Sequence, residues 1–157
     1  GQWQVHMTPN ISLTPSNPVE LSNFMALEQH PDAAEYVTQN SLKEHLASFF
    51  ERDITYLTIE KDGIPAGFLL LALDIDGLSV ELKRVVVDTK ESGVGQAAMR
   101  LLERYVRDEI GRSRIWLDVF TTNSRAIHVY KKLGYTEFDT DFYPDGRPLI
   151  LFEKQLA

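Results

Sequence analysis

The stretch VVVDTKESGVGQ, at residues 85–96, decides the fold because it joins a strand-like segment to a helical one. Valines end the first segment, and a helical pattern over residues 95–110 follows, with Gly111 as its stop signal. Gly93 and Gly95 let the backbone approach an anion closely, and the unpaired N–H groups at a helix start attract phosphate. The stretch therefore predicts a strand, an anion-binding turn and a helix.

Three strands joined by tight turns precede this junction. Residues 54–60 alternate between apolar and polar, residues 66–73 form an apolar run, and residues 79–87 end in the valines. The turns at residues 61–63 and 76–77 are short enough to require antiparallel pairing. We therefore expect an antiparallel meander.

The second half of the chain predicts a crossover connection. A strand is expected at residues 115–119, a short helix at 123–133, and two more strands at 136–143 and 148–152. A strand, a long helix and a strand in succession form a right-handed parallel crossover. The expected class is α+β, with a mixed sheet in which an antiparallel meander precedes a βαβ crossover and helices flank the sheet.

The beginning of the chain predicts a short strand at residues 11–14 and two helices. Pro18 opens the first helix, and Ser41 caps the second with Glu44 three residues later, which is a capping-box pattern.

The chain is expected to be a single domain. Residues 1–6 resemble a remnant of an expression vector, which would make Met7 the native start. Because no repeat, low-complexity segment or linker divides the rest, we assign residues 7–157 to one domain.

Composition restricts the function classes. The 157 residues are 43% hydrophobic and 25% charged, include no cysteine and carry a net charge of −7. Disulfides and thiol catalysis are excluded, and the acidic balance argues against a nucleic-acid partner. The longest apolar run, residues 67–73, is too short to span a bilayer, so we expect no membrane partner and a cytoplasmic protein.

The glycine turn has rival interpretations. A P-loop is excluded because residues 96–98 supply neither the lysine nor the hydroxyl that it needs. The dinucleotide-binding fingerprint fits Gly93, Gly95 and Ala98. Asp118 follows at about the separation in sequence at which that fingerprint has an acidic residue for the ribose. However, the turn follows a meander, and only 39 residues follow Asp118, which is too few for the second half of that fold.

Three segments carry the most specific signals: KESGVG at residues 90–95, NSRAIHVYKKLGY at residues 123–135 and KDGIPAGF at residues 61–68. Together they resemble the GNAT superfamily of N-acetyltransferases. The first follows that family's Arg/Gln-x-x-Gly-x-Gly/Ala signature, with Lys90 as its departure. The second resembles the family's second signature, and the third resembles its hairpin between the second and third strands.

This resemblance implies an enzyme that transfers an acetyl group from acetyl-CoA to a primary amine of a small molecule, peptide or protein, without a metal. It also implies that the backbone of Val85 and Val87 and the side chain of Asn123 bind the pantetheine arm. Asn123 is equally suited to cap the short helix. The diphosphate is expected on the segment formed by Lys90, Ser92, Gly93, Val94, Gly95 and Gln96.

Amine acetylation needs a base for the acceptor and an acid for the departing thiolate. Tyr130 occupies the family's tyrosine position and is the expected acid, although a core aromatic role stays open. Glu81 is the candidate base, and alternation places it on the same strand face as Val85 and Val87. A surface ion pair of Glu81 with a neighbouring cation stays open, as do Asp118 and water as the base.

The identity of the acceptor amine is the property that the sequence determines least. In this family it usually enters between the first two helices and the last strand-to-strand loop. His30, His45 and His128 lack metal-ligand spacing and are expected at the surface or at helix ends. A homodimer and a non-catalytic acyl-CoA-binding domain stay open. The candidate acceptor linings, whose acidity suggests a cationic acceptor, are Glu28, Gln29, His30, Asp32, Glu35, Asp139, Asp141, Tyr143 and Asp145.

Overall fold

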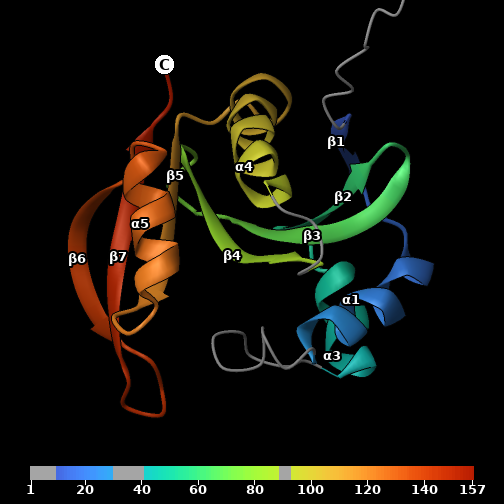
Figure 1. The fold of residues 1–157 in the computed structure, drawn as a ribbon, viewed down its shortest axis with the longest axis horizontal. Helices are drawn as coiled ribbons and strands as arrows, with labels where there is room; N and C mark the ends of the chain where they lie inside the picture. The colour runs from blue at the N-terminus through green and yellow to red at the C-terminus, as the bar shows by residue number, and fades with distance from the viewer. Residues whose placement is uncertain (1–9, 30–40, 89–92) are drawn as a thin grey trace, which may run out of the picture.

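The computed structural model describes residues 10–29, 41–88 and 93–157, and its centre is one seven-stranded sheet in the order β1-β2-β3-β4-β5-β7-β6 (Figure 1). Only β4 and β5 pair in parallel; every other neighbouring pair is antiparallel. The mixed sheet of the α+β class is therefore confirmed. The strands are β1 (Ile11–Pro15), β2 (Ile54–Lys61), β3 (Ile64–Leu73), β4 (Ser79–Val87), β5 (Arg114–Phe120), β6 (Thr136–Phe142) and β7 (Pro148–Gln155).

Helices cover both faces of the sheet. In Figure 1, α4 lies on one side of the meander, and α1 and α3 lie together on the other. The helix expected at residues 95–110 is confirmed, but its last six residues, Tyr105–Ile110, form a π-helical turn. The helices are α1 (Leu21–Glu28), which follows a 3₁₀ turn at Pro18–Glu20, α3 (Leu42–Phe49), α4 (Val94–Arg104) and α5 (Ser124–Lys132).

Local signals in the sequence account for the element ends. The Ser41 hydroxyl accepts from the Glu44 N–H and the Glu44 carboxylate accepts from the Ser41 N–H, which confirms the capping box of α3. Asp62 and Gly63 both adopt positive φ, as a two-residue hairpin turn requires. Gly111 ends the helical segment in the left-handed conformation.

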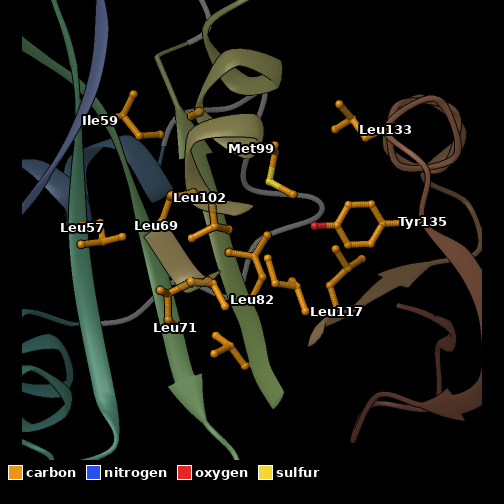
Figure 2. Close-up of a cluster of buried hydrophobic side chains, with 14 of the residues drawn as sticks. Leu57, Ile59, Leu69, Leu71, Leu82, Met99, Leu102, Leu117, Leu133 and Tyr135 are labelled. Atoms are coloured by element: carbon orange, nitrogen blue, oxygen red, sulfur yellow. The ribbon is translucent and has the colours of Figure 1, made fainter. Parts of the chain in front are cut away.

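The sheet separates two apolar cores. The larger one lies between the sheet and α4, where Figure 2 shows Leu102 and Met99 of α4 close to strand residues such as Leu69 and Leu82. The smaller one lies under α1, where the Phe24 and Phe68 rings stack with centroids 4.4 Å apart. Membership of one core or the other therefore reveals which face each strand residue occupies.

A β-bulge in β4 corrects the expected placement of Glu81. Leu70 pairs with Arg84 while Leu71 pairs with Leu82, so one extra residue interrupts the alternation. As a result, Val85 packs against the α4-side core, whereas Glu81, next to the α4-side residue Leu82, faces the α1 side. The prediction that Glu81 shares a face with Val85 and Val87 is wrong, because strict alternation does not survive a bulge.

Candidate active site

The strands β4 and β5 diverge after a short contact. Their parallel ladder joins only Ser79 to Glu81 with Arg114 to Trp116, and beyond it the two strands separate. A cavity of about 440 Å³ lies in this gap. Because no strand of the described residues pairs with the β5-facing side of β4 beyond Glu81, the backbone groups on that side are suited to bind another extended group. The cavity is lined by Glu81, Leu82, Lys83, Arg84, Val85, Leu117, Asp118, Val119, Phe120, Asn123, Ala126, Tyr130, Tyr143 and Leu149.

The glycine turn leads into α4 without a side-chain cap. Gly93 is the N-cap residue with φ of 79°, and because glycine has no side chain it cannot itself cap the first-turn N–H groups, which include those of Val94, Gly95 and Gln96. Among the described residues, a Cβ at Gly95 would meet only the Val87 Cγ2 atom, at 3.6 Å, so the packing of these residues does not require glycine there. Two other expected diphosphate residues, Lys90 and Ser92, lie outside the described residues.

Tyr130 lines the cavity from α5. Its ring lies 6.0 Å from the Tyr135 ring and 6.3 Å from the Phe152 ring, so it belongs partly to the core as well. Burial raises the pKa of Tyr130 to about 12, and the nearby Asp118 carboxylate adds to the shift. Because its pKa is raised, the Tyr130 hydroxyl stays protonated. No hydrogen bond among the described residues uses this hydroxyl, so it can donate to a ligand.

Glu81 and Asp118 line the same cavity from β4 and β5. Burial raises the pKa of Glu81, and Asp118 and Asp74 raise it further while Lys83 opposes them. The pKa of Asp118 is also raised, by burial and by Asp141. The expected alternative, an ion pair of Glu81 with Lys83 or Arg84, is not found among the described residues. Two carboxylates with raised pKa values at one cavity are suited to accept protons.

Asn123 and Val85 also line the cavity. The Asn123 Oδ1 atom accepts from the Ala126 N–H at 3.2 Å, so its capping role is confirmed while its side chain still borders the cavity. Val85 reaches the cavity from β4, and Val87 lies two residues further along the strand. Their proposed contacts with a pantetheine arm stay predictions.

The expected acceptor linings separate into groups. Tyr143 lines the cavity and packs edge-on against Phe120, with ring centroids 5.3 Å apart. Asp145 instead bonds the Arg147 guanidinium in the turn between β6 and β7. Asp139 and Asp141 lie on the exposed strand β6, and Gln29 is exposed after α1. The remaining candidates, His30, Asp32 and Glu35, lie outside the described residues.

Two sequence predictions fail at a buried polar cluster under α1. Glu28, expected to line the acceptor site, and His45, expected at the surface or at a helix end, are both fully buried, and His45 lies inside α3. The Glu28 carboxylate accepts from His45 Nε2 at 2.5 Å and from Arg84 at 3.0 Å, and His45 Nδ1 bonds the Tyr56 hydroxyl at 2.7 Å. A buried charge is tolerated only with such partners, which explains why these residues lie inside.

Sequence reasoning also missed Arg84, which lines the cavity and holds Glu28. A signal existed for Glu28, because it continues the helical spacing of the buried residues Leu21 and Phe24. No comparable signal existed for Arg84, since its orientation depends on the bulge.

Two further properties concern ligands and membranes. Across residues 10–29, 41–88 and 93–157, no group of three or more histidines and carboxylates is arranged to hold a metal ion. Within the same ranges, every helix is too short or too polar to cross a membrane.

Family comparison places this geometry in a known class. The model of the acetyltransferase (GNAT) family matches residues 19–135, which is most of the chain. The protein therefore belongs to the GNAT acetyltransferase family, and the resemblance of its sequence motifs is confirmed.

Individual relatives share this class. The chain is 29% identical over 129 residues to a mycothiol acetyltransferase of Nocardiopsis dassonvillei, a match that covers 76% of this chain but 39% of that protein. It is 29% identical over 155 residues to an IAA acetyltransferase of Azospirillum brasilense, covering 94% and 99% of the two chains. The spermidine N-acetyltransferase of Vibrio cholerae, solved with CoA and spermine, has the same fold, with a TM-score of 0.78 and 16% identity over 93% of this chain and 95% of that one.

Proposed function

We propose that this protein transfers the acetyl group of acetyl-CoA to a primary amine. The observation that carries the proposal is the cavity between β4 and β5, where Tyr130 stands on one side and the carboxylates of Glu81 and Asp118 stand on the other. A site for acyl transfer to nitrogen needs an acid and a base of this kind on the two sides of the reacting carbonyl.

The described residues fit acetyl-CoA in two respects. The unpaired side of β4 near Val85 and Val87 offers backbone groups that an extended pantetheine arm can join as an added strand would. The start of α4, where the N-cap Gly93 has no side chain to cap it, offers N–H groups to the diphosphate. The thioester supplies the acetyl group, and the residues around it hold and orient it.

The proton balance assigns the remaining roles. A C–N bond forms and the C–S bond breaks, so the amine must lose a proton and the sulfur must gain one. Glu81, whose pKa is raised by burial, accepts a proton from the acceptor directly or through water. Tyr130, which stays protonated because burial raises its pKa to about 12, donates a hydrogen bond to the departing sulfur, and the released thiolate takes its proton from water.

Charge favours a cationic acceptor. Asp118 raises the pKa of Glu81, and Asp141 raises the pKa of Asp118, so the three carboxylates lie near one another. An ammonium ion entering this group of carboxylates is attracted before it is deprotonated. The spermidine N-acetyltransferase that shares the fold is named for an acceptor of this chemistry, which supports the proposal.

A thiol-release assay with acetyl-CoA and a panel of amines tests the function. We expect release that depends on the amine, and a matching acetylated product by mass spectrometry. Stabilisation by acetyl-CoA without thiol release from any amine would indicate a binding domain. Stabilisation by NADH but not by acetyl-CoA would support the dinucleotide interpretation instead.

A further inference from the structure

A second cavity, of about 470 Å³ and wide open to solvent, lies near the turn between β3 and β4. Its apolar walls include Trp116 of β5, Phe138 of β6 and Leu151 of β7, together with Ile75 of the turn. Ile75 is fully exposed and Phe138 is 39% exposed, so large apolar side chains border the opening. Exposed apolar groups gathered around a cavity are typical of a ligand-binding surface.

This cavity adjoins the candidate active site across two strand pairs. Glu81 of the active site is the register partner of Trp116, and Asp118 of the active site is the register partner of Leu151. Partners on neighbouring strands project from the same face of a sheet. Because Leu117 belongs to the α4-side core, Trp116 and Asp118 project to the opposite face, where Glu81 also lies.

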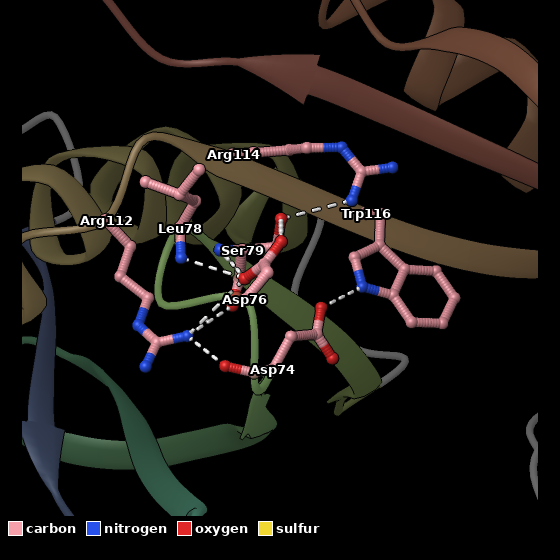
Figure 3. Close-up of polar contacts among 7 residues, drawn as sticks. All are labelled: Asp74, Asp76, Leu78, Ser79, Arg112, Arg114 and Trp116. Carbon is pink, nitrogen blue, oxygen red and sulfur yellow. Dashed lines mark hydrogen bonds and ion pairs between the residues drawn. The ribbon is translucent and has the colours of Figure 1, made fainter.

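The polar groups around the second cavity are already engaged. The Trp116 indole N–H donates to Asp74 Oδ2 at 2.5 Å, and the Asp76 carboxylate accepts from the Leu78 and Ser79 N–H groups, as Figure 3 shows. The Arg114 guanidinium bonds the Glu153 carboxylate. Partners within the protein thus satisfy these polar atoms, which leaves mainly ring and alkyl surface for a ligand.

The two aromatic rings give the cavity a defined shape. The Trp116 and Phe138 rings stand edge to face, with centroids 6.4 Å apart and an interplanar angle of 86°. The Arg114 guanidinium lies 4.8 Å from the Phe138 centroid and supports that ring. Two supported rings at a right angle form a corner into which an aromatic or branched group can pack.

We propose that this cavity is a specificity subsite for an aromatic or branched aliphatic group of the acceptor, whose amine lies at Glu81 and Asp118. The inference rests on the proposed acetyl transfer. Register partners lie roughly 5 Å apart and diagonal neighbours roughly 7–8 Å apart, so a short alkyl spacer joins the amine to the apolar group. The preferred acceptors are therefore arylalkylamines or peptides with an apolar residue beside the amine.

The experiment compares phenethylamine and tryptamine with n-butylamine, which lacks a ring. We expect kcat/KM to be about 10- to 100-fold higher for the aromatic amines, since a buried ring contributes on that scale. Phe138→Ala is expected to remove most of this preference, mainly through KM, while n-butylamine turnover stays within about twofold. Ile64→Ala, which removes an exposed apolar side chain at the other end of β3, serves as the control. We expect it to leave kcat/KM unchanged for both the aromatic amines and n-butylamine.

The kinetic results decide for or against the subsite when the variants have the same melting temperature as the parent protein. Equal kcat/KM for phenethylamine and n-butylamine in the parent would overturn the subsite while leaving acetyl transfer intact. Equal losses for both amines in Phe138→Ala would overturn it as well, because the ring would then have only a general role. Absence of product from every amine would overturn the proposed function and the subsite together.

Discussion

Tyr130→Phe tests the acid directly, because it removes one hydroxyl and keeps the ring. The ring contacts with Tyr135 and Phe152 remain possible for phenylalanine. Since the hydroxyl makes no hydrogen bond among the described residues, we expect the free energy of unfolding to change by less than about 0.5 kcal/mol. A change in rate would therefore report the chemistry and not a loss of fold.

The size of the rate effect follows from the raised pKa of Tyr130. With a pKa of about 12, against roughly 8.5 for an ordinary thiol, complete transfer of the proton to sulfur is uphill by about 3.5 pKa units. The hydroxyl therefore acts mainly as a hydrogen-bond donor to developing negative charge, which is worth about 1.5–3 kcal/mol. This corresponds to a loss of about 10- to 150-fold in kcat on replacement by phenylalanine.

Steady-state kinetics, acetyl-CoA affinity and thermal melting of Tyr130→Phe provide the assay. We expect kcat and kcat/KM to fall together while acetyl-CoA affinity is retained. The parent enzyme should show no Tyr130 ionisation in its rate profile between about pH 6 and 9, because the pKa lies near 12. Near-parental turnover in a stably folded variant would falsify the acid role and leave Tyr130 as a core aromatic.

Three further variants test separate parts of the structure. Gly95→Val should fold, since among the described residues a Cβ there meets only Val87 Cγ2 at 3.6 Å, yet it should lose thermal stabilisation by acetyl-CoA; retained stabilisation would contradict the diphosphate assignment. Glu81→Gln should lower kcat/KM most at pH values above the raised pKa of Glu81 but below neutral-to-alkaline pH, and less at high pH, because the carboxylate takes the proton that an ammonium acceptor must lose and a free amine needs no such base; parallel pH profiles would assign the base elsewhere. Glu28→Gln should cost about 3 kcal/mol or more in urea unfolding, since it leaves the Arg84 charge and His45 without their carboxylate, whereas the exposed Glu109→Gln should cost almost nothing; similar losses in the two variants would refute the importance of the buried cluster.

Much of the fold was predictable because the local signals in the sequence, such as turns and helix caps, agree with the observed strands and helices. The meander follows from alternating strands joined by turns such as the one at Asp62 and Gly63. The capping box at Ser41 and the glycine at Gly111 mark helix ends within a residue of their observed positions. Such signals act over a few residues, so they can be read without knowing what packs against them.

The candidate site was predictable only in part. The motifs identify Tyr130, Asn123 and the glycine turn, and the structure brings Tyr130 and Asn123 to one cavity with Glu81. The orientation of Glu81 was not predictable, because the bulge in β4 arises from pairing with β3 and has no local signature.

By itself, the sequence determined the order of the elements, the antiparallel meander with its crossover, and the motifs that identify the candidate site. Periodicity and turn chemistry are properties of neighbouring residues, and these set the elements. Only the tertiary structure decided that β4 separates from β5 after Glu81, that Glu28 and His45 are buried, and that Trp116 adjoins the site. These features depend on pairings between residues far apart in the chain, whose energies no local pattern encodes.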